Sequence, residues 1–87
     1  MDEYFLPKLS ERVINFLQNQ GKSKFTVVAY KKDIEQFIGF LASKEKSDIR
    51  EVKKEDIEGF IQSLLGKNYT KKSASRKLNS IRTFFRF

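Results

Sequence analysis

Apolar and basic residues alternate with a helical period over the last third of this chain. Ala74, Leu78, Ile81 and Phe85 follow one another at steps of four, three and four residues. This spacing predicts one stripe of an α-helix, with Thr70 as its N-cap. The remaining flank carries basic and small polar residues and no acid: Lys72, Ser75, Arg76, Asn79, Arg82, Thr83 and Arg86. The segment is therefore predicted to be an amphipathic helix with a water-exposed face of one sign.

The positive charge of the chain is concentrated in this segment. The chain contains 18 Lys and Arg against 11 Asp and Glu, which gives a formal net charge of +7. Seven of the basic residues lie between Lys67 and Phe87, and no acidic residue occurs after Glu58. Solvated helices usually mix both signs, because opposite charges four residues apart attract each other. A flank of one sign therefore indicates a polyanionic partner such as nucleic acid.

Composition excludes several classes of protein. The chain has no cysteine and no histidine, one proline and four glycines. Disulfides are excluded, and so are the commonest metal ligand and the commonest general base, so we expect no catalysis, no metal and no cofactor. There is no signal-peptide pattern and no apolar run near the roughly 20 residues of a membrane helix, which predicts a cytoplasmic protein. The length predicts one domain over residues 1–87, built from long helices.

The periodicity predicts an all-α, four-helix bundle. After a leader over residues 1–7, helices are expected over residues 8–20, 24–43 and 54–65, followed by the basic helix. Ser23 is the predicted N-cap of the second helix, and Gly21 the left-handed residue that ends the first. The short connections are normal for a compact bundle. The predicted core of the first three helices comprises Leu9, Val13, Phe16 and Leu17, then Val27, Tyr30, Ile34, Phe37, Ile38 and Leu41, then Ile57, Phe60, Ile61, Leu64 and Leu65.

Several segments, in order along the chain, resemble one known family. They are Phe16-Leu17, then Ser23, Thr26, Tyr30, Asp33, Ile34, Phe37 and Phe40-Leu41, then Val52-Lys53-Lys54-Glu55-Asp56-Ile57, and last the segment from Thr70 to Phe87. The last two are similar to the patterns V-T-x-x-D-I and S-x-x-S-x-x-R-x-L-x-x-[IL]-R-x-F-[YF]-x-[FY]. Residues 9–87 thus resemble the N-terminal core-binding domain of tyrosine recombinases, the phage integrase and Xer group. Lys53 departs from the pattern, because the family usually has Thr or Ser there.

The resemblance implies a SAM-like four-helix bundle that forms half of a C-shaped clamp around duplex DNA. Its second and fourth helices would face the major groove during DNA integration or recombination. The catalytic half of the family follows in the same chain, so we expect this chain to be truncated after residue 87 and to lack catalytic activity. The implied partners are double-stranded DNA, the catalytic domain of the parent chain and other recombinase protomers, with no membrane.

Two patches supply the candidate DNA-binding residues. The patch of the fourth helix comprises Thr70, Lys71, Lys72, Ser73, Ser75, Arg76, Lys77, Asn79 and Arg82. The patch at the start of the second helix comprises Lys22, Ser23, Lys24, Thr26, Tyr30 and Lys31. The cations are expected to neutralise phosphates, and Thr70 and Ser73 lie at a helix N-terminus, which favours anions. Ser75, Arg76 and Asn79 have the reach for base edges.

Other interpretations of the same features stay open. The basic helix could be a solvated face, and the chain could be a free-standing helical module that docks an acidic partner or self-associates through its aromatic C-terminus. A carboxylate-pair hydrolase is not favoured, because Asp33 and Glu35 point to different faces of one helix. Asp33, Glu35, Asp56 and Glu58 are instead expected to be salt-bridging surface residues. The family's nucleophilic tyrosine belongs to its catalytic half, so Tyr4, Tyr30 and Tyr69 are not candidates for it.

Overall fold

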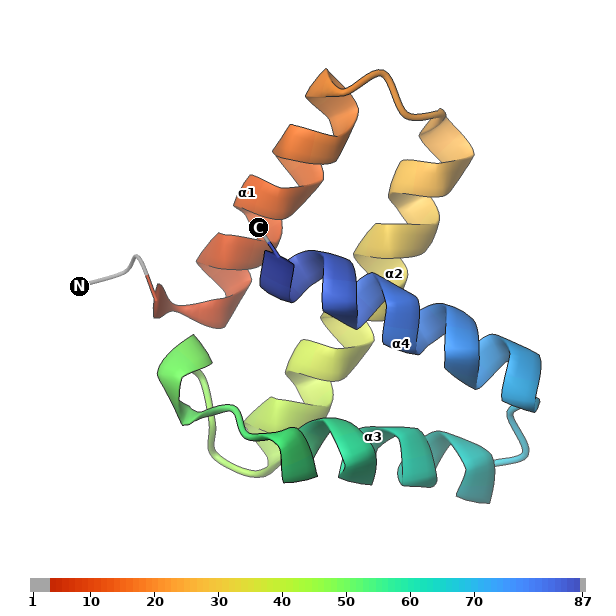
Figure 1. Ribbon diagram of the computed structural model, residues 1–87. Coiled ribbons are helices and arrows are strands. Elements are labelled where there is room, and N and C mark those ends of the chain that lie inside the picture. Colours follow the sequence, from red (N-terminus) through yellow and green to blue (C-terminus); the bar gives the residue numbers. More distant parts are fainter. Residues whose placement is uncertain (1–3, 87) are drawn as a thin grey trace.

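The computed structural model describes residues 4–86, and helices account for most of them (Figure 1). The elements are α1 (Leu6–Asn19), α2 (Lys24–Ser43), the short 3₁₀ helix η2 (Ile49–Glu51), α3 (Lys54–Gly66) and α4 (Lys71–Arg86). The predicted all-α bundle is confirmed, and the predicted helix bounds differ from these by no more than two residues. Over residues 4–86, no helix is long and apolar enough to cross a bilayer.

The helix α2 is the element that each of the other three α-helices contacts. Figure 1 shows α1 and α2 as an antiparallel hairpin, with α4 crossing in front of the middle of α2. The helix α3 runs along one edge, antiparallel to α4, and packs against both α4 and α2. The last turn of α4 ends beside α1 in this view. This arrangement leaves one long flank of α4 on the outside of the bundle.

The core is built around the buried face of α2. Ile34, Phe37 and Leu41 are each 0% exposed, and the ring of Phe37 meets that of Phe60 edge-on at a centroid distance of 5.2 Å. Complete burial of one such side chain stabilises a fold by about 1.5–3 kcal/mol. The other helices contribute Leu6, Val13 and Leu17 from α1, Phe60 and Leu64 from α3, and Ala74, Ile81 and Phe84 from α4.

The buried line of α4 differs from the predicted one. Ala74 and Ile81 are buried as expected and Phe84 is 3% exposed, whereas Phe85 of the predicted stripe is 37% exposed. Lys77 is 6% exposed and completes the buried line. The helix α4 packs against α2 on one side and α3 on the other. The residues that face α2 are therefore buried more deeply than the periodicity alone predicted.

Two other core predictions are wrong because hydrophobic periodicity does not show which edge of an apolar stripe is buried. Phe16 on α1 and Leu65 on α3 were expected in the core and are 44% and 38% exposed. Each lies at the edge of a wide apolar stripe, where periodicity cannot separate a buried position from one at the rim.

The described part of the predicted leader belongs to the fold. Leu6 opens α1 and is 0% exposed, and its N–H donates to the carbonyl oxygen of Ser47 at 2.8 Å. Phe5 forms an isolated antiparallel bridge with Asp48. These contacts fasten the start of α1 to the connection between α2 and α3. Residues 1–3 lie outside the described range.

The helix ends follow the predicted local chemistry. The hydroxyl of Ser23 accepts a hydrogen bond from the N–H of Thr26 at 3.1 Å, and that of Thr70 accepts one from the N–H of Ser73 at 3.1 Å. Both predicted N-caps are therefore confirmed. Gly21 has φ +77°, the left-handed conformation that commonly terminates a helix and that glycine adopts at little cost.

Candidate nucleic-acid interface

The outer flank of α4 carries the predicted basic face. Lys72, Ser75, Asn79 and Arg82 recur at steps of three, four and three residues, and all four are exposed. Lys71 and Arg76 border this line and are exposed as well. We call the set the basic strip: Lys71, Lys72, Ser75, Arg76, Asn79 and Arg82. Because α4 contains no acidic residue, the strip is positive along its whole length.

The predicted patch at the start of α2 is divided by the structure. Lys22 and Tyr30 line a hollow of about 470 Å³ together with Thr83 and Arg86 from the end of α4. Lys24 and Lys31 line a second hollow, against α1, which Lys22 borders as well. Of the remaining two patch residues, Ser23 is exposed and Thr26 half-buried. The structure therefore brings only part of the patch close to α4. It also adds Arg86, which was predicted on the basic flank but not among the candidate DNA-binding residues.

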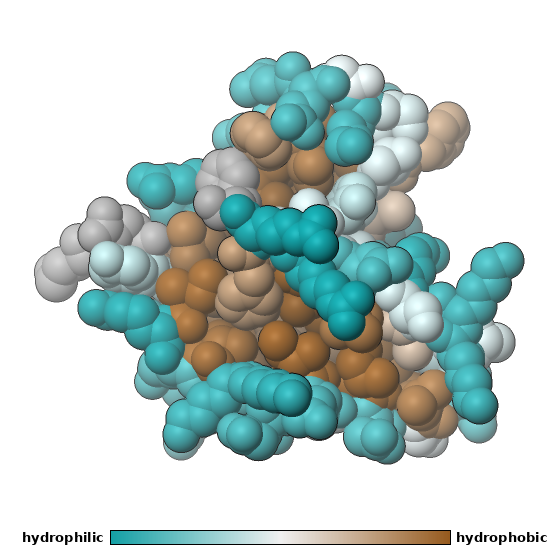
Figure 2. All heavy atoms as spheres, in the orientation of Figure 1, coloured by the Kyte–Doolittle hydropathy of each residue, from teal (hydrophilic) through white to brown (hydrophobic). Residues whose placement is uncertain are grey.

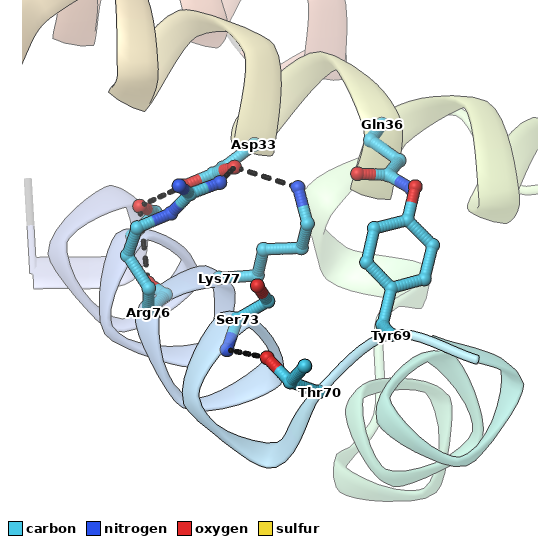
Figure 3. Close-up of polar contacts among 8 residues, drawn as sticks. Asp33, Gln36, Tyr69, Thr70, Ser73, Arg76 and Lys77 are labelled. Atoms are coloured by element: carbon cyan, nitrogen blue, oxygen red, sulfur yellow. Dashed lines mark hydrogen bonds and ion pairs between the residues drawn. The ribbon is translucent and has the colours of Figure 1, made fainter. Parts of the chain in front are cut away.

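Asp33 on α2 receives three side chains of α4 (Figure 3). Its Oδ1 accepts hydrogen bonds from Lys77 Nζ at 2.9 Å and Arg76 Nη2 at 3.0 Å. Its Oδ2 accepts one from Ser80 Oγ at 2.8 Å. The expectation that Asp33 is a surface residue is wrong, because Asp33 is 0% exposed. Its charge is nevertheless paired, as a buried carboxylate requires.

The charge state of Asp33 follows from two opposing effects. Burial by itself raises the pKa of Asp33, but hydrogen bonds from Lys77, Ser80 and Arg76 and the charge of Lys77 outweigh it and hold the pKa below its ordinary value. The carboxylate is therefore ionised at neutral pH. It binds α2 to α4 through one neutral and two charged donors.

Lys77 has a different role from the one expected. It was predicted on the exposed basic face, but it is 6% exposed, and its Nζ lies on Asp33 and 5.5 Å from the ring centroid of Tyr69. A phosphate would have to displace Asp33 to reach this ammonium group. The expectation of an exposed Lys77 is therefore wrong, and the basic strip excludes it. Arg76 contacts the same carboxylate, yet its side chain remains 58% exposed.

A sequence signal for this cluster existed. Lys77 lies three residues after Ala74 and four before Ile81, so it occupies the core line of α4. Asp33 lies three residues after Tyr30 and four before Phe37, so it occupies the core line of α2 in the same way. A cation and a carboxylate that both interrupt apolar lines indicate a buried ion pair, because either charge alone would be too costly to bury.

A second carboxylate is also buried contrary to expectation. Asp56 is 6% exposed and accepts hydrogen bonds from Lys46 Nζ at 2.7 Å and from the backbone N–H of Lys53 at 2.8 Å. The hydrogen bond from Lys46, followed by that from Lys53, lowers the pKa of Asp56. The side chain of Lys53 cannot accept a hydrogen bond, so Asp56 caps the start of α3 from inside the helix. Glu35 and Glu58 are exposed, as expected.

Comparison with known proteins gives consistent matches. The family model for the phage integrase N-terminal SAM-like domain matches residues 11–87. Tyrosine recombinase XerC of Oceanobacillus iheyensis is 36% identical over 75 residues, which cover 85% of this chain and 25% of the relative. The XerC proteins of Thermodesulfovibrio yellowstonii and Listeria welshimeri are 34% and 30% identical, over 86% and 92% of this chain and 25% and 27% of their own lengths. No solved structure matches the chain. The chain thus spans about a quarter of the length of these curated relatives.

Proposed function

Because this chain belongs to the family of phage integrase N-terminal SAM-like domains, we propose that it is the core-binding domain of a site-specific tyrosine recombinase and that it binds duplex DNA. The observation that carries this proposal is the basic strip of α4. All of its residues are exposed, and no acid lies on the same helix. Such a surface favours a phosphate backbone over a neutral partner.

The dimensions of the strip suit a DNA groove. Lys72 and Arg82 are ten residues apart, which corresponds to about 15 Å along a helix at 1.5 Å per residue. The major groove of B-DNA is about 12 Å wide and admits an α-helix. Cations near the two ends of the strip can therefore reach phosphates on opposite sides of the groove. The middle of the strip would then lie over the base pairs.

Each part of the strip has a proposed role. Lys71, Lys72 and Arg82 neutralise phosphates, whereas Ser75, Arg76 and Asn79 approach base edges. Arg76 enters the groove already oriented, because one of its guanidinium nitrogens is held by Asp33. A side chain held in place before binding loses less conformational entropy on contact.

Further contacts are proposed at two helix starts. Thr70 and Ser73 at the start of α4 add N-terminal anion affinity. The start of α2 supplies a second contact, through Lys22 and Tyr30 beside α4 and through Ser23, Lys24, Thr26 and Lys31 around it. Together, α2 and α4 would hold one side of the duplex.

The activity of the whole protein is a further part of the proposal. The relatives are named as tyrosine recombinases, and the matched residues cover only about a quarter of their length. We therefore assign the breaking and joining of DNA to a catalytic domain of the parent protein. The present domain would hold the duplex against that catalytic domain and beside other protomers, in the cytoplasm, and it needs no cofactor for this task.

Fluorescence anisotropy with a labelled duplex tests the proposal. We expect micromolar or weaker binding that fades steeply between about 50 and 200 mM salt. Replacing Lys72 and Arg82 with Gln should weaken binding at least about tenfold, because two phosphate contacts are lost. Adding Arg76→Gln should abolish binding.

Controls separate a specific surface from net charge. A variant with Gln at Lys8, Arg12 and Lys53 removes three exposed charges outside the basic strip and should bind much more tightly than the strip triple variant. Melting curves establish that each variant is folded, which matters most for Arg76 because it contacts Asp33. Equal losses in the two triple variants, or unaltered binding in the strip variants, would refute the proposed interface.

A further inference from the structure

An open apolar groove lies between α3 and α4. Its floor is made by Ile57 of α3 and by Leu78, Ile81 and Phe85 of α4, and its volume is about 520 Å³. Figure 2 shows a continuous hydrophobic surface, bordered by hydrophilic margins, over the region where these two helices lie side by side. Phe85 is 37% exposed, so a large aromatic surface remains in contact with water. Surface of this kind commonly marks an interaction site.

The rim of the groove is charged and unbalanced. Lys54, Arg82 and Arg86 supply three cations, and Glu58 supplies the single carboxylate among the lining residues. An occupant with acidic groups at its margins would therefore be attracted at three points. Arg82 is the only residue that the groove shares with the basic strip.

Two occupants fit poorly. A DNA duplex gains nothing from an apolar floor, because its outer surface is a charged backbone. A second copy of this chain carries the same net charge of +7, and its basic helix α4 has no acid to offer the rim. The duplex therefore does not match the apolar floor, and a second copy does not match the cationic rim.

An amphipathic helix fits both the floor and the rim. The helices α3 and α4 are antiparallel neighbours joined by residues 67–70, and adjacent helices present a groove into which the side-chain ridge of a third helix packs. Helix-in-groove recognition uses apolar anchors at i, i+3, i+4 and i+7. Acidic residues flanking those anchors would face Lys54 and the two arginines.

We propose that this groove binds an amphipathic helix of a partner protein, with its apolar stripe on Ile57, Leu78 and Phe85 and acidic side chains against Lys54, Arg82 and Arg86. The proposed groove site shares only Arg82 with the DNA interface, since the rest of the basic strip lies outside the groove. A seated helix leaves Lys72, Arg76 and Asn79 uncovered, so the domain can hold a duplex and a partner together.

Titration of the isotope-labelled chain with three synthetic peptides tests this proposal by NMR. The first peptide carries leucines at helical spacing with glutamates on both flanks, the second carries lysines in place of the glutamates, and the third is a scrambled version of the first. We expect saturable shifts of the amide signals of Ile57, Leu78 and Phe85 with the first peptide alone. Absence of these shifts at millimolar peptide, or equal shifts with all three peptides, would overturn the proposal.

Charge reversal at the rim gives the matched variant. Lys54→Glu should weaken binding of the acidic peptide at least about tenfold, whereas Lys8→Glu should change it less than about twofold. Both substitutions place an acid in the first turn of a helix, where it is favourable, so neither should unfold the domain. Equal effects of the two substitutions would rule out the groove as the site. DNA titrations report separately on Lys72 and Asn79, so failure of the DNA proposal would leave this result interpretable.

Discussion

The ammonium nitrogen of Lys77 lies 2.9 Å from Oδ1 of Asp33, and neither side chain is more than 7% exposed. The two residues are 44 positions apart in the sequence and belong to α4 and α2. Their contact joins the two helices that we propose to face DNA. Of two lysines on the same helix, Lys77 thus stabilises the fold, whereas Lys72 remains exposed for a partner.

The two partners of this ion pair should not be equivalent in mutagenesis. Asp33→Ala leaves the ammonium of Lys77 buried without a carboxylate, and we expect a loss of about 3–5 kcal/mol in the free energy of unfolding. Lys77→Met leaves Asp33 with Arg76 and Ser80, and should cost about 1.5–3 kcal/mol. Urea denaturation at low temperature measures both variants.

The double variant Asp33→Leu with Lys77→Met replaces the whole ion pair with apolar side chains. It removes both buried charges, so it should recover much of the stability lost in Asp33→Ala. Equal losses in the two single variants would contradict a pair in which Asp33 is the shared acceptor.

Acid should destabilise the domain through Asp33 and Asp56. Burial raises the pKa of Asp33, but the hydrogen bonds to its carboxylate lower this pKa by more than burial raises it. The hydrogen bond from Lys46 lowers the pKa of Asp56. A carboxyl group whose pKa falls on folding contributes stability above its unfolded pKa of about 3.9 and loses it as the pH drops through the folded pKa. The free energy of unfolding should therefore be level near neutral pH and fall below about pH 4.

Thermal melts followed by circular dichroism between about pH 7 and pH 2 measure this dependence. In Asp56→Asn the fall at low pH should be smaller than in the parent chain, because one of the linked groups is gone. A parent chain whose melting temperature is level down to pH 2 would contradict the assignment.

Removal of a single lysine should change the salt dependence of DNA binding only where that lysine is exposed. Lys72→Met should lower the slope of log affinity against log salt by about 0.9, the value for one phosphate contact on B-DNA. Lys77→Met should leave the slope unchanged, because the charge of Lys77 is neutralised by Asp33 inside the fold. Equal changes in the two slopes would mean that Lys77 leaves Asp33 in the complex.

Two glycines should respond to the same substitution with opposite signs. Gly21 has φ +77°, so Gly21→Ala forces a side chain into a left-handed conformation and should destabilise by about 1–2 kcal/mol. Gly39 lies inside α2 and a Cβ there would meet nothing within 4 Å, so Gly39→Ala should stabilise by about 0.5–1 kcal/mol. Melting temperatures of the two variants check this, and a stabilised Gly21→Ala would contradict the role of Gly21 as a helix end.

Most helix ends were predictable because they depend on neighbouring residues. The hydroxyls of Ser23 and Thr70 bond to N–H groups three residues away, and Gly21 acts through its own backbone. The start of α1 lies two residues before the predicted one, at Leu6, whose N–H bonds to Ser47, a residue distant in sequence.

The sequence by itself determined the four helices, their order and the positive sign of the outer flank of α4, since periodicity, capping and charge act within a few residues. Only the tertiary structure decided how far each helix is rotated toward its neighbours. Adjacent helical positions differ by about 100° around the helix axis. A rotation of the helix about that axis by part of this angle therefore exchanges a core residue for a surface one. Contact with α2 and α3 therefore buried Lys77 and Phe84, exposed Phe85, and left the apolar groove beside it open.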